Sequence, residues 1–253
     1  MTDFLGTPFL PLKKVTLAMI DSRMDPEIKR HLRNQGIDLI EMPPCHTLYD
    51  SISCHPDIQC HPVGGNRIVV APNVSESLKN QLIQHNFEII TGNTSLEGNY
   101  PKDIAYNVAR IGDYALHNAA YTDPVLKDIL DSLGVKLVHV NQGYSKCSAA
   151  IVSEHALITS DKGMAAAARE CGIDVLPIRP GHIMLKGMNY GFIGGTCGLT
   201  GPDELFFTGD IEQHPDYPQI SSFAAKHGKR IQAYKGKNLT DVGSIIPLKE
   251  IKE

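Results

Sequence analysis

Four residues with chemically active side chains stand at similar places in separate, similar segments of the chain. Three are aspartates that directly precede an aliphatic residue, Asp57, Asp103 and Asp241, and the fourth is Cys147. A further segment carries Phe192 at the same place. Carboxylates gathered around a thiol make a poor apolar core, because buried charges are costly, but they suit the binding of a small cation. We therefore expect these side chains to meet at one cation-binding site.

His55 and Gln59 flank Asp57 at a spacing of two residues. If this segment is a strand, alternation places all three side chains on one face. Histidine changes charge near neutral pH, so His55 is predicted to move a proton while Asp57 and Gln59 bind the substrate. The alternative is a hydrogen-bonded histidine at the start of a strand. By the same alternation, Lys146 points away from Cys147 and is expected at the surface.

The elements that must position these residues form a unit that recurs about five times, at a spacing of roughly 40 to 55 residues. Each unit reads as strand, polar turn, helix, stop residue and strand. Asp25-Pro26 and Asp123-Pro124 place a capping carboxylate before a proline at the first helical position. The helices are predicted to stop at Gly36, Asn86, Gly134, Gly172 and Gly228, the residue types that enter the left-handed conformation most freely.

Between one unit and the next lie stretches that are too long for a single strand and contain glycine or polar breaks. They are residues 63–70, 104–116, 148–158 and 192–207. We interpret them as hairpins, which makes each unit ββαβ and argues against a doubly wound sheet. The glycine-rich segment 191–198 lacks the ending of a phosphate-binding loop and is predicted to be a tight hairpin where another backbone comes close.

Five ββαβ units around an axis, with an aspartate before the strand and the ending Asp241-Val242-Gly243-Ser244-Ile245-Ile246-Pro247, resemble the guanidine-modifying enzymes, or penteins. The chain looks closest to an uncharacterised bacterial branch of that superfamily. The resemblance implies one α/β propeller domain over residues 1–253. It also implies that residues 244–248 form a strand beside residues 15–20 and close the ring.

The resemblance also implies an activity. In the characterised penteins, carboxylates hold a guanidinium group, a histidine acts as acid and base, and a cysteine of the last unit attacks the guanidinium carbon. The implied function here is a hydrolase or transferase acting on a C–N bond of a small cationic substrate, without a cofactor. Ser244 stands nearest to the position expected for that cysteine, and it is assigned with the aspartates to substrate binding.

The chain departs from the pentein pattern at its last unit, because no cysteine follows Cys197. A serine is a far weaker nucleophile unless a base activates it. Three alternatives follow. The nucleophile has moved to Cys147, the protein binds a cation without turnover, or it catalyses a different reaction.

Segment 45–61 raises the question of zinc, since thiolate and imidazole are preferred zinc ligands. It contains the pairs Cys45-His46, Cys54-His55 and Cys60-His61. Their spacing is not that of a zinc finger, and strand alternation would separate thiols from imidazoles. We therefore predict no metal site, with a zinc-dependent hydrolase as the weaker alternative.

Composition limits the partners. The chain has 253 residues and a net charge of −4, which argues against nucleic acid and anionic membranes. No apolar run approaches the ~20 residues of a membrane span. The first residues lack the basic and apolar regions of a signal peptide, and six irregularly spaced cysteines suit a reducing compartment. We expect a cytoplasmic protein that binds a small cationic molecule, with a homodimer as a possible assembly.

Overall fold

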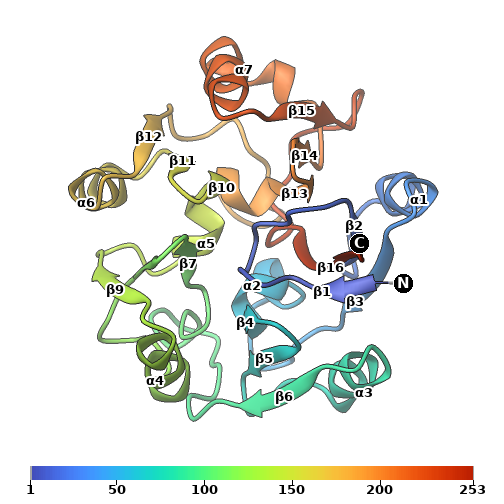
Figure 1. Ribbon diagram of the computed structural model, residues 1–253, viewed down its shortest axis with the longest axis vertical. Helices are drawn as coiled ribbons and strands as arrows, with labels where there is room; N and C mark the ends of the chain where they lie inside the picture. Colours follow the sequence, from blue (N-terminus) through green and yellow to red (C-terminus); the bar gives the residue numbers. More distant parts are fainter. Residues whose placement is uncertain (1, 253) are drawn as a thin grey trace.

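The structure is a computed structural model that describes residues 2–252, so the predicted span of 1–253 includes two terminal residues outside this range. Within the described part, five small sheets stand around a central axis, and each carries a helix on its outer side (Figure 1). Every sheet contains an antiparallel inner pair followed, through the helix, by a parallel outer strand. The predicted ring of five ββαβ units is confirmed.

The first sheet closes the ring, because it joins the two ends of the chain. Its C-terminal strand runs antiparallel to its first long strand, with Ile246 opposite Met19. This pairing agrees with the expected contact between residues 244–248 and 15–20. In order across the sheet, its strands are β1 (Thr2–Phe4), β16 (Ile246–Ile251), β2 (Val15–Asp21) and β3 (Asp38–Met42), with α1 (Pro26–Asn34) joining the last two.

The other four units share one order: two hairpin strands, a helix and an outer strand. They are β4 (Cys60–Gly64), β5 (Arg67–Val70), α3 (Glu76–Gln84) and β6 (Glu88–Thr91); β7 (Ala109–Ile111), β8 (Tyr114–His117), α4 (Pro124–Ser132) and β9 (Lys136–His139); β10 (Ala150–Ser153), β11 (Ala156–Thr159), α6 (Lys162–Glu170) and β12 (Asp174–Pro177); and β13 (Cys197–Gly201), β14 (Glu204–Phe207), α7 (Tyr217–Lys226) and β15 (Arg230–Ala233).

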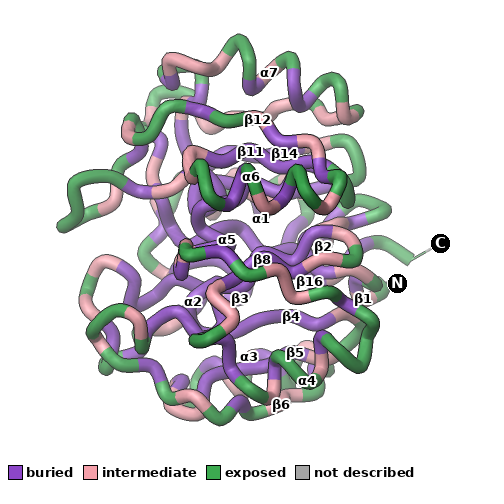
Figure 2. The backbone as a smooth tube through the Cα atoms, turned by 90° about the vertical axis from the view of Figure 1, so that its left-hand side faces the viewer, coloured by how far each residue is buried: buried purple, intermediate pink, exposed green. Residues whose placement is uncertain are grey.

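Local chemistry sets the ends of the helices. The side chains of Asp25 and Asp123 accept hydrogen bonds from backbone N–H groups in the first turns of α1 and α4. Each predicted stop residue has a positive φ, from 61° at Asn86 to 82° at Gly36. Buried aliphatic strands form the inner part of the ring, while the outer faces of α6 and α7 are exposed (Figure 2). Within residues 2–252, no helix is long and apolar enough to cross a bilayer.

Short helical turns, and not strands, precede three of the inner hairpins. They are α2 (Pro56–Gln59), α5 (Ser145–Ser148) and the 3-10 helix η2 (Ile193–Thr196). The prediction that His55, Asp57 and Gln59 alternate along a strand is therefore wrong. Pro56 stands at the first position of α2, where its fixed φ favours a helical turn.

The strand pairing also corrects the predicted register. Cys60 pairs with Val70, the last residue of β5, and Cys197 pairs with Phe207, the last residue of β14. Extending two further inner pairings by one residue places Val108 opposite His117 and Ala149 opposite Thr159, again the last strand residues. In the first sheet the same step places Ile245 opposite Ile20, because β2 runs one residue further, to Asp21. The residue before each of these five is polar and buried. We call them the pre-strand polar residues: Gln59, Asn107, Ser148, Thr196 and Ser244.

Asp57 and Cys147 do not occupy equivalent positions in this corrected register. Asp57 lies three residues before Cys60, whereas Cys147 lies two residues before Ala149. Their side chains meet for a different reason: the turns α2 and α5 enter the middle of the ring from two units that the β7–β9 unit separates.

Candidate functional site

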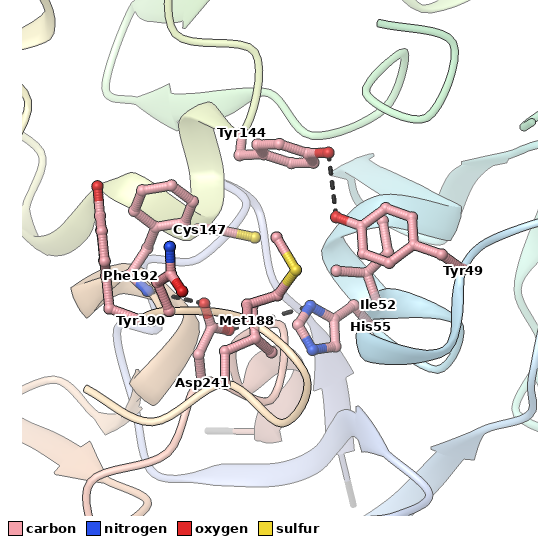
Figure 3. Close-up of a pocket in the computed structure, with 11 residues that line it drawn as sticks. Tyr49, Ile52, His55, Tyr144, Cys147, Met188, Tyr190, Phe192 and Asp241 are labelled. Carbon is pink, nitrogen blue, oxygen red and sulfur yellow. Dashed lines mark hydrogen bonds and ion pairs between the residues drawn. The ribbon is translucent and has the colours of Figure 1, made fainter. Parts of the chain in front are cut away.

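A cavity of about 220 Å³ opens beside α2 and α5. Its walls are mostly aromatic and aliphatic, and we call the part formed by Cys147, His55 and Asp241 its polar end (Figure 3). The loop that leads into η2 supplies one wall, and the 3-10 helix η1 (Asp50–Ile52) supplies the opposite one. The lining residues are Tyr49, Ile52, His55, Tyr144, Cys147, Leu185, Met188, Asn189, Tyr190, Phe192 and Asp241.

Cys147 presents its thiol to the polar end of this cavity. The side chain is buried, and Sγ donates to the carboxylate of Asp57, at 3.2 Å from Oδ2 and 3.3 Å from Oδ1. Burial raises the pKa of the Cys147 thiol well above its usual value, and the charge of Asp57 raises it further. At rest, the group is therefore a protonated thiol with a proton acceptor in contact.

Asn107 fixes the position of Cys147. Its Oδ1 accepts from the backbone N–H groups of Lys146 (2.8 Å) and Cys147 (3.2 Å). Its Nδ2 donates to Cys147 Sγ at 3.2 Å and to the backbone oxygen of Asp57 at 3.0 Å. Sequence reasoning missed Asn107, and the available signal was its position among the pre-strand polar residues.

The other side of Asp57 is connected to Ser244 and Lys146. Ser244 Oγ donates to Asp57 Oδ2 at 2.7 Å, and Lys146 Nζ donates to Ser244 Oγ at 2.9 Å. The hydroxyl of Ser244 thus joins an ammonium group to a carboxylate, and Ser244 is not part of the cavity lining. The expectation of a surface Lys146 is wrong: the residue is 4% exposed, and Nζ lies 5.2 Å from the ring centroid of Phe9.

His55 and Asp241 form the remaining polar part of the cavity wall. His55 Nδ1 lies 4.0 Å from Asp241 Oδ1, and Nε2 lies 3.9 Å from Oδ2 of the buried Asp21. Gly243 permits this arrangement, because a Cβ there would stand 2.4 Å from that of His55. Asp21 is a second residue that sequence reasoning missed. It ends β2 and carries no motif.

Asp241 is held by backbone groups. It accepts from the N–H of Phe192 at 2.8 Å and from that of Gly243 at 3.0 Å. A Cβ at Gly195 would lie 1.9 Å from its Oδ1, so the glycine-rich segment makes room for this carboxylate. Burial raises the pKa of Asp241, although the nearby His55 opposes that shift.

Asp103 does not line the cavity, because the side chain of Tyr144 lies between them. Tyr144 donates to its Oδ2 at 2.5 Å, and the hydroxyl of Tyr49 is 3.2 Å from that of Tyr144. Burial raises the pKa of Asp103, against the effect of the Tyr144 hydrogen bond. The structure thus connects Asp103 to the cavity through Tyr144 and does not place it in the lining.

Gln59 has no place at the cavity. Its Nε2 donates to the backbone oxygens of Pro43 and Ser53, at 2.9 and 2.8 Å. These bonds tie two loop segments to the end of α2. The structure therefore gives Gln59 a structural contact away from the lining residues where a substrate would bind.

The Cys-His pairs of segment 45–61 do not gather around one point. Among the residues that the structure describes, one group has metal-binding donors close together: His55, Asp57 and Cys147, whose donor atoms all lie within 4.8 Å of one another. Only two of these residues come from the segment that suggested zinc. Burial also lowers the pKa of His61 to about 3, and its ring packs against Phe9.

One family profile matches most of the chain. The profile of a family described only as a family of unknown function, DUF6873, matches residues 19–246. No curated protein matches the chain.

Solved structures with the same fold are enzymes that share little sequence with this chain. It is similar to inosamine-phosphate amidinotransferase from Streptomyces griseus, with 10% identity, coverage of 99% of this chain and 98% of the other, and a TM-score of 0.62. An amidinotransferase of saxitoxin biosynthesis from Microseira wollei shows 9% identity, 91% coverage of both chains and a TM-score of 0.60. An agmatine deiminase from C. jejuni shows 8% identity, coverage of 92% and 91%, and a TM-score of 0.53. The pentein fold is thereby confirmed.

Proposed function

The chain belongs to DUF6873, a family of unknown function, and from that premise we propose that it is an enzyme acting on a C–N bond of a small, guanidino-type cation. One observation carries the proposal: Cys147, His55 and Asp241 line one cavity, and the thiol of Cys147 donates a hydrogen bond to Asp57. This set combines a nucleophile, an acid/base group and negative charge. The solved pentein structures named above are amidinotransferases and an agmatine deiminase, which supports a proposed substrate of the guanidino type.

The proposed nucleophile is Cys147. Its thiol passes its proton to Asp57, and the thiolate attacks the central carbon of the guanidinium group. A cation in the cavity favours this step, because positive charge near the thiol stabilises the thiolate against the effects of burial and of Asp57. The enzyme would thus keep its thiol protonated until a cationic substrate arrives.

The proposed acid/base group is His55, which lies on the same cavity wall. It gives a proton to the leaving nitrogen when the C–N bond breaks. The carbon then remains bound to sulfur until water or an acceptor amine replaces Cys147. Asp241, 4.0 Å from His55 Nδ1, stabilises the protonated imidazole and contributes to holding the cation.

The cation would bind between the negatively charged carboxylates and the aromatic rings. Tyr49, Tyr144, Tyr190 and Phe192 line the cavity, and aromatic faces attract cations. Asp103 acts behind Tyr144, since its carboxylate accepts that hydroxyl. In this proposal Asp57, Asp103 and Asp241 contribute negative potential, while Ser244 supports Asp57 and does not touch substrate.

A product screen tests the proposal. Arginine, agmatine, methylated arginines and peptidyl-arginine are incubated with the protein and with its Cys147→Ser variant, and release of ammonia, amine or urea is measured. We expect one substrate class to give product with the wild type only. Product formation by both proteins would contradict the role of Cys147.

A second function, binding without turnover, is favoured by the raised pKa of the resting Cys147 thiol. Under this alternative, no compound yields product, but a cationic ligand still raises the melting temperature. Asp57→Asn should weaken that ligand by about 1.5–3 kcal/mol in either case, the scale of a hydrogen bond to a charged group. Thermal stabilisation that Asp57→Asn removes, with no product, would establish a binding protein.

A further inference from the structure

We infer that the polar end of the cavity is also a binding site for a transition metal ion such as Zn²⁺, with His55, Asp57 and Cys147 as its ligands. The three residue types are those that zinc uses, and all three side chains are buried. The site draws on two units of the ring, because Cys147 follows His55 by 92 residues (147 − 55). It is therefore a different site from the Cys-His segment of the sequence.

The distances suit one ion with a small adjustment. Zinc bonds of about 2.0–2.3 Å in a tetrahedron place neighbouring donors about 3.2–3.8 Å apart. Cys147 Sγ and Asp57 Oδ2 are already 3.2 Å apart. The imidazole lies within 4.8 Å of both donors, so a modest rotation of His55 closes the set.

His55 shows the signs of an imidazole that lacks its partner. Its Nδ1 is buried and, within residues 2–252, accepts or donates no hydrogen bond. Buried polar atoms rarely remain without a partner. The opposite nitrogen, Nε2, faces Asp21 Oδ2 at 3.9 Å. A carboxylate behind the second nitrogen is common at a metal-bound histidine. In this structure Asp21 Oδ2 pairs with Arg23 at 2.7 Å, and the 3.9 Å gap to Nε2 would have to close when the ion binds.

The cavity gives the ion an open side. Three protein ligands leave one tetrahedral position for water or another small ligand, and His55 and Cys147 both line the cavity. When the ion binds, the Cys147 thiol becomes a thiolate and its proton is released to solvent. The bound ion would occupy the Cys147 sulfur and the Asp57 carboxylate, the two groups that the proposed reaction needs for attack and for proton transfer, and it would repel a second cation. Metal and guanidino-type substrate therefore exclude one another, a consequence that rests on the function proposed above, whereas metal binding itself does not.

Cobalt(II) spectroscopy tests the site without any substrate. The full chain is freed of metal with a chelator and titrated with Co²⁺. We expect one equivalent to bind with a near-ultraviolet thiolate-to-cobalt charge-transfer band, and Zn²⁺ to displace it. Cys147→Ser should abolish the band, and His55→Gln should weaken Co²⁺ binding by at least about 100-fold, beyond the 10–100-fold typical of residues behind the ligands.

Two matched variants control for other thiols and imidazoles. Cys171→Ser removes a partly exposed thiol, and His46→Gln removes an exposed histidine of the Cys-His segment. Both should bind Co²⁺ like the wild type. A charge-transfer band that survives in Cys147→Ser, equal affinity in His55→Gln and the wild type, or no band in the wild type would each overturn the inference.

Activity separates this inference from the proposed function. Turnover is measured in excess chelator and again with added Zn²⁺. Product formation in chelator together with a cobalt band supports both ideas. Product formation without a cobalt band overturns only the metal site, and a cobalt band without product from any cation overturns only the catalytic proposal.

Discussion

Two units of the ring, the one that contains β10 and the one that contains β16, both send a potential nucleophile toward Asp57, but only the β10 unit exposes it to the cavity. Cys147 lines the cavity, whereas the hydroxyl of Ser244 is engaged between Lys146 and Asp57. The strand register explains the difference. The counterpart of Ser244 in the β10 unit is Ser148, and the counterpart of Cys147 in the β16 unit is Gly243. The two residues thus stand one position apart in equivalent segments: Cys147 faces the cavity, whereas Ser244 faces Asp57 and supports it.

The largest expected effect comes from moving the thiol between these two units. Cys147→Ser should lower turnover by at least about 1,000-fold, because an unactivated hydroxyl is a poor nucleophile. Adding Ser244→Cys to that variant should not restore activity, since position 244 does not reach the cavity lining. The measurement is product release from whichever cation the screen identifies.

Cation binding is the control for folding of the double variant: its affinity for that cation should stay within about threefold of the wild type, because both Cys147→Ser and Ser244→Cys are nearly isosteric and neither removes a carboxylate. Recovery of turnover by Ser244→Cys would contradict the comparison. It would return the nucleophile to the unit in which the pentein resemblance first places it.

The next effect concerns the buried ammonium group of Lys146, which lies in α5. Lys146→Met keeps the length of the side chain but removes the charge that balances Asp57 through Ser244. Removing one member of a buried charged network costs about 3–5 kcal/mol of unfolding free energy. Urea denaturation measures this loss.

Lys102→Met is the matched control for that measurement. Lys102 pairs with Glu97 at the surface, where its side chain is 62% exposed. Surface ion pairs contribute little, so this variant should change stability by less than about 1 kcal/mol. Equal losses in the two variants would mean that Lys146 does not balance a buried carboxylate.

The ring of units could be predicted from sequence because its signals are local. Asp123-Pro124 starts a helix and Gly134 ends one through backbone chemistry that needs no distant partner. The hairpins could be predicted as well, because a polar or glycine break within an apolar stretch sets their turns. Even the close approach of another backbone at segment 191–198 is visible as a surplus of glycine: a Cβ at Gly194 would collide with Ala149 O and one at Gly198 with Ile245 O. The tight hairpin predicted for this segment is wrong, because residues 193–196 form the 3-10 turn η2.

The site could be predicted only in part, because its contacts are long-range. Cys147, His55 and Asp241 were identified as candidates, and the structure brings them to one cavity. Their geometry was wrong, since a one-turn helix replaces the expected strand at Asp57. Asn107 was missed, because its place among the pre-strand polar residues is recognised only once the strand register is known, and its contacts with Cys147 span 40 residues.

A smaller effect distinguishes the two equivalent serines. Ser244→Ala removes hydrogen bonds to two charged groups and should cost about 1.5–3 kcal/mol of unfolding free energy. Ser148→Ala should be nearly neutral, because Ser148 Oγ has no hydrogen-bond partner within residues 2–252. Both changes are compared by denaturant unfolding.

Ser244 also has a φ of 75°, so Ser244→Gly is a useful second variant. It relieves the backbone strain while still removing the hydroxyl. A loss of stability in Ser244→Gly that exceeds any change in Ser148→Ala would assign the effect to the hydrogen bonds. Equal behaviour of the two serines would remove the distinction between the units.

The smallest effect concerns the proton on Cys147. The charge of Asp57 contributes to the raised pKa of this thiol, second only to burial. Asp57→Asn removes that charge, so the thiolate should form at lower pH and react faster with iodoacetamide near neutral pH. A shift of one pH unit gives an increase of about tenfold, because the thiolate is the reacting species. Alkylation is followed by mass spectrometry in the presence of chelator, with Cys171 as the internal reference.

The full pH profile separates the two explanations of a faster rate: a lower pKa moves the profile along the pH axis, whereas a wider cavity raises the rate equally at every pH. A profile that rises without moving would show that Asp57 holds Cys147 by shape alone and not by charge.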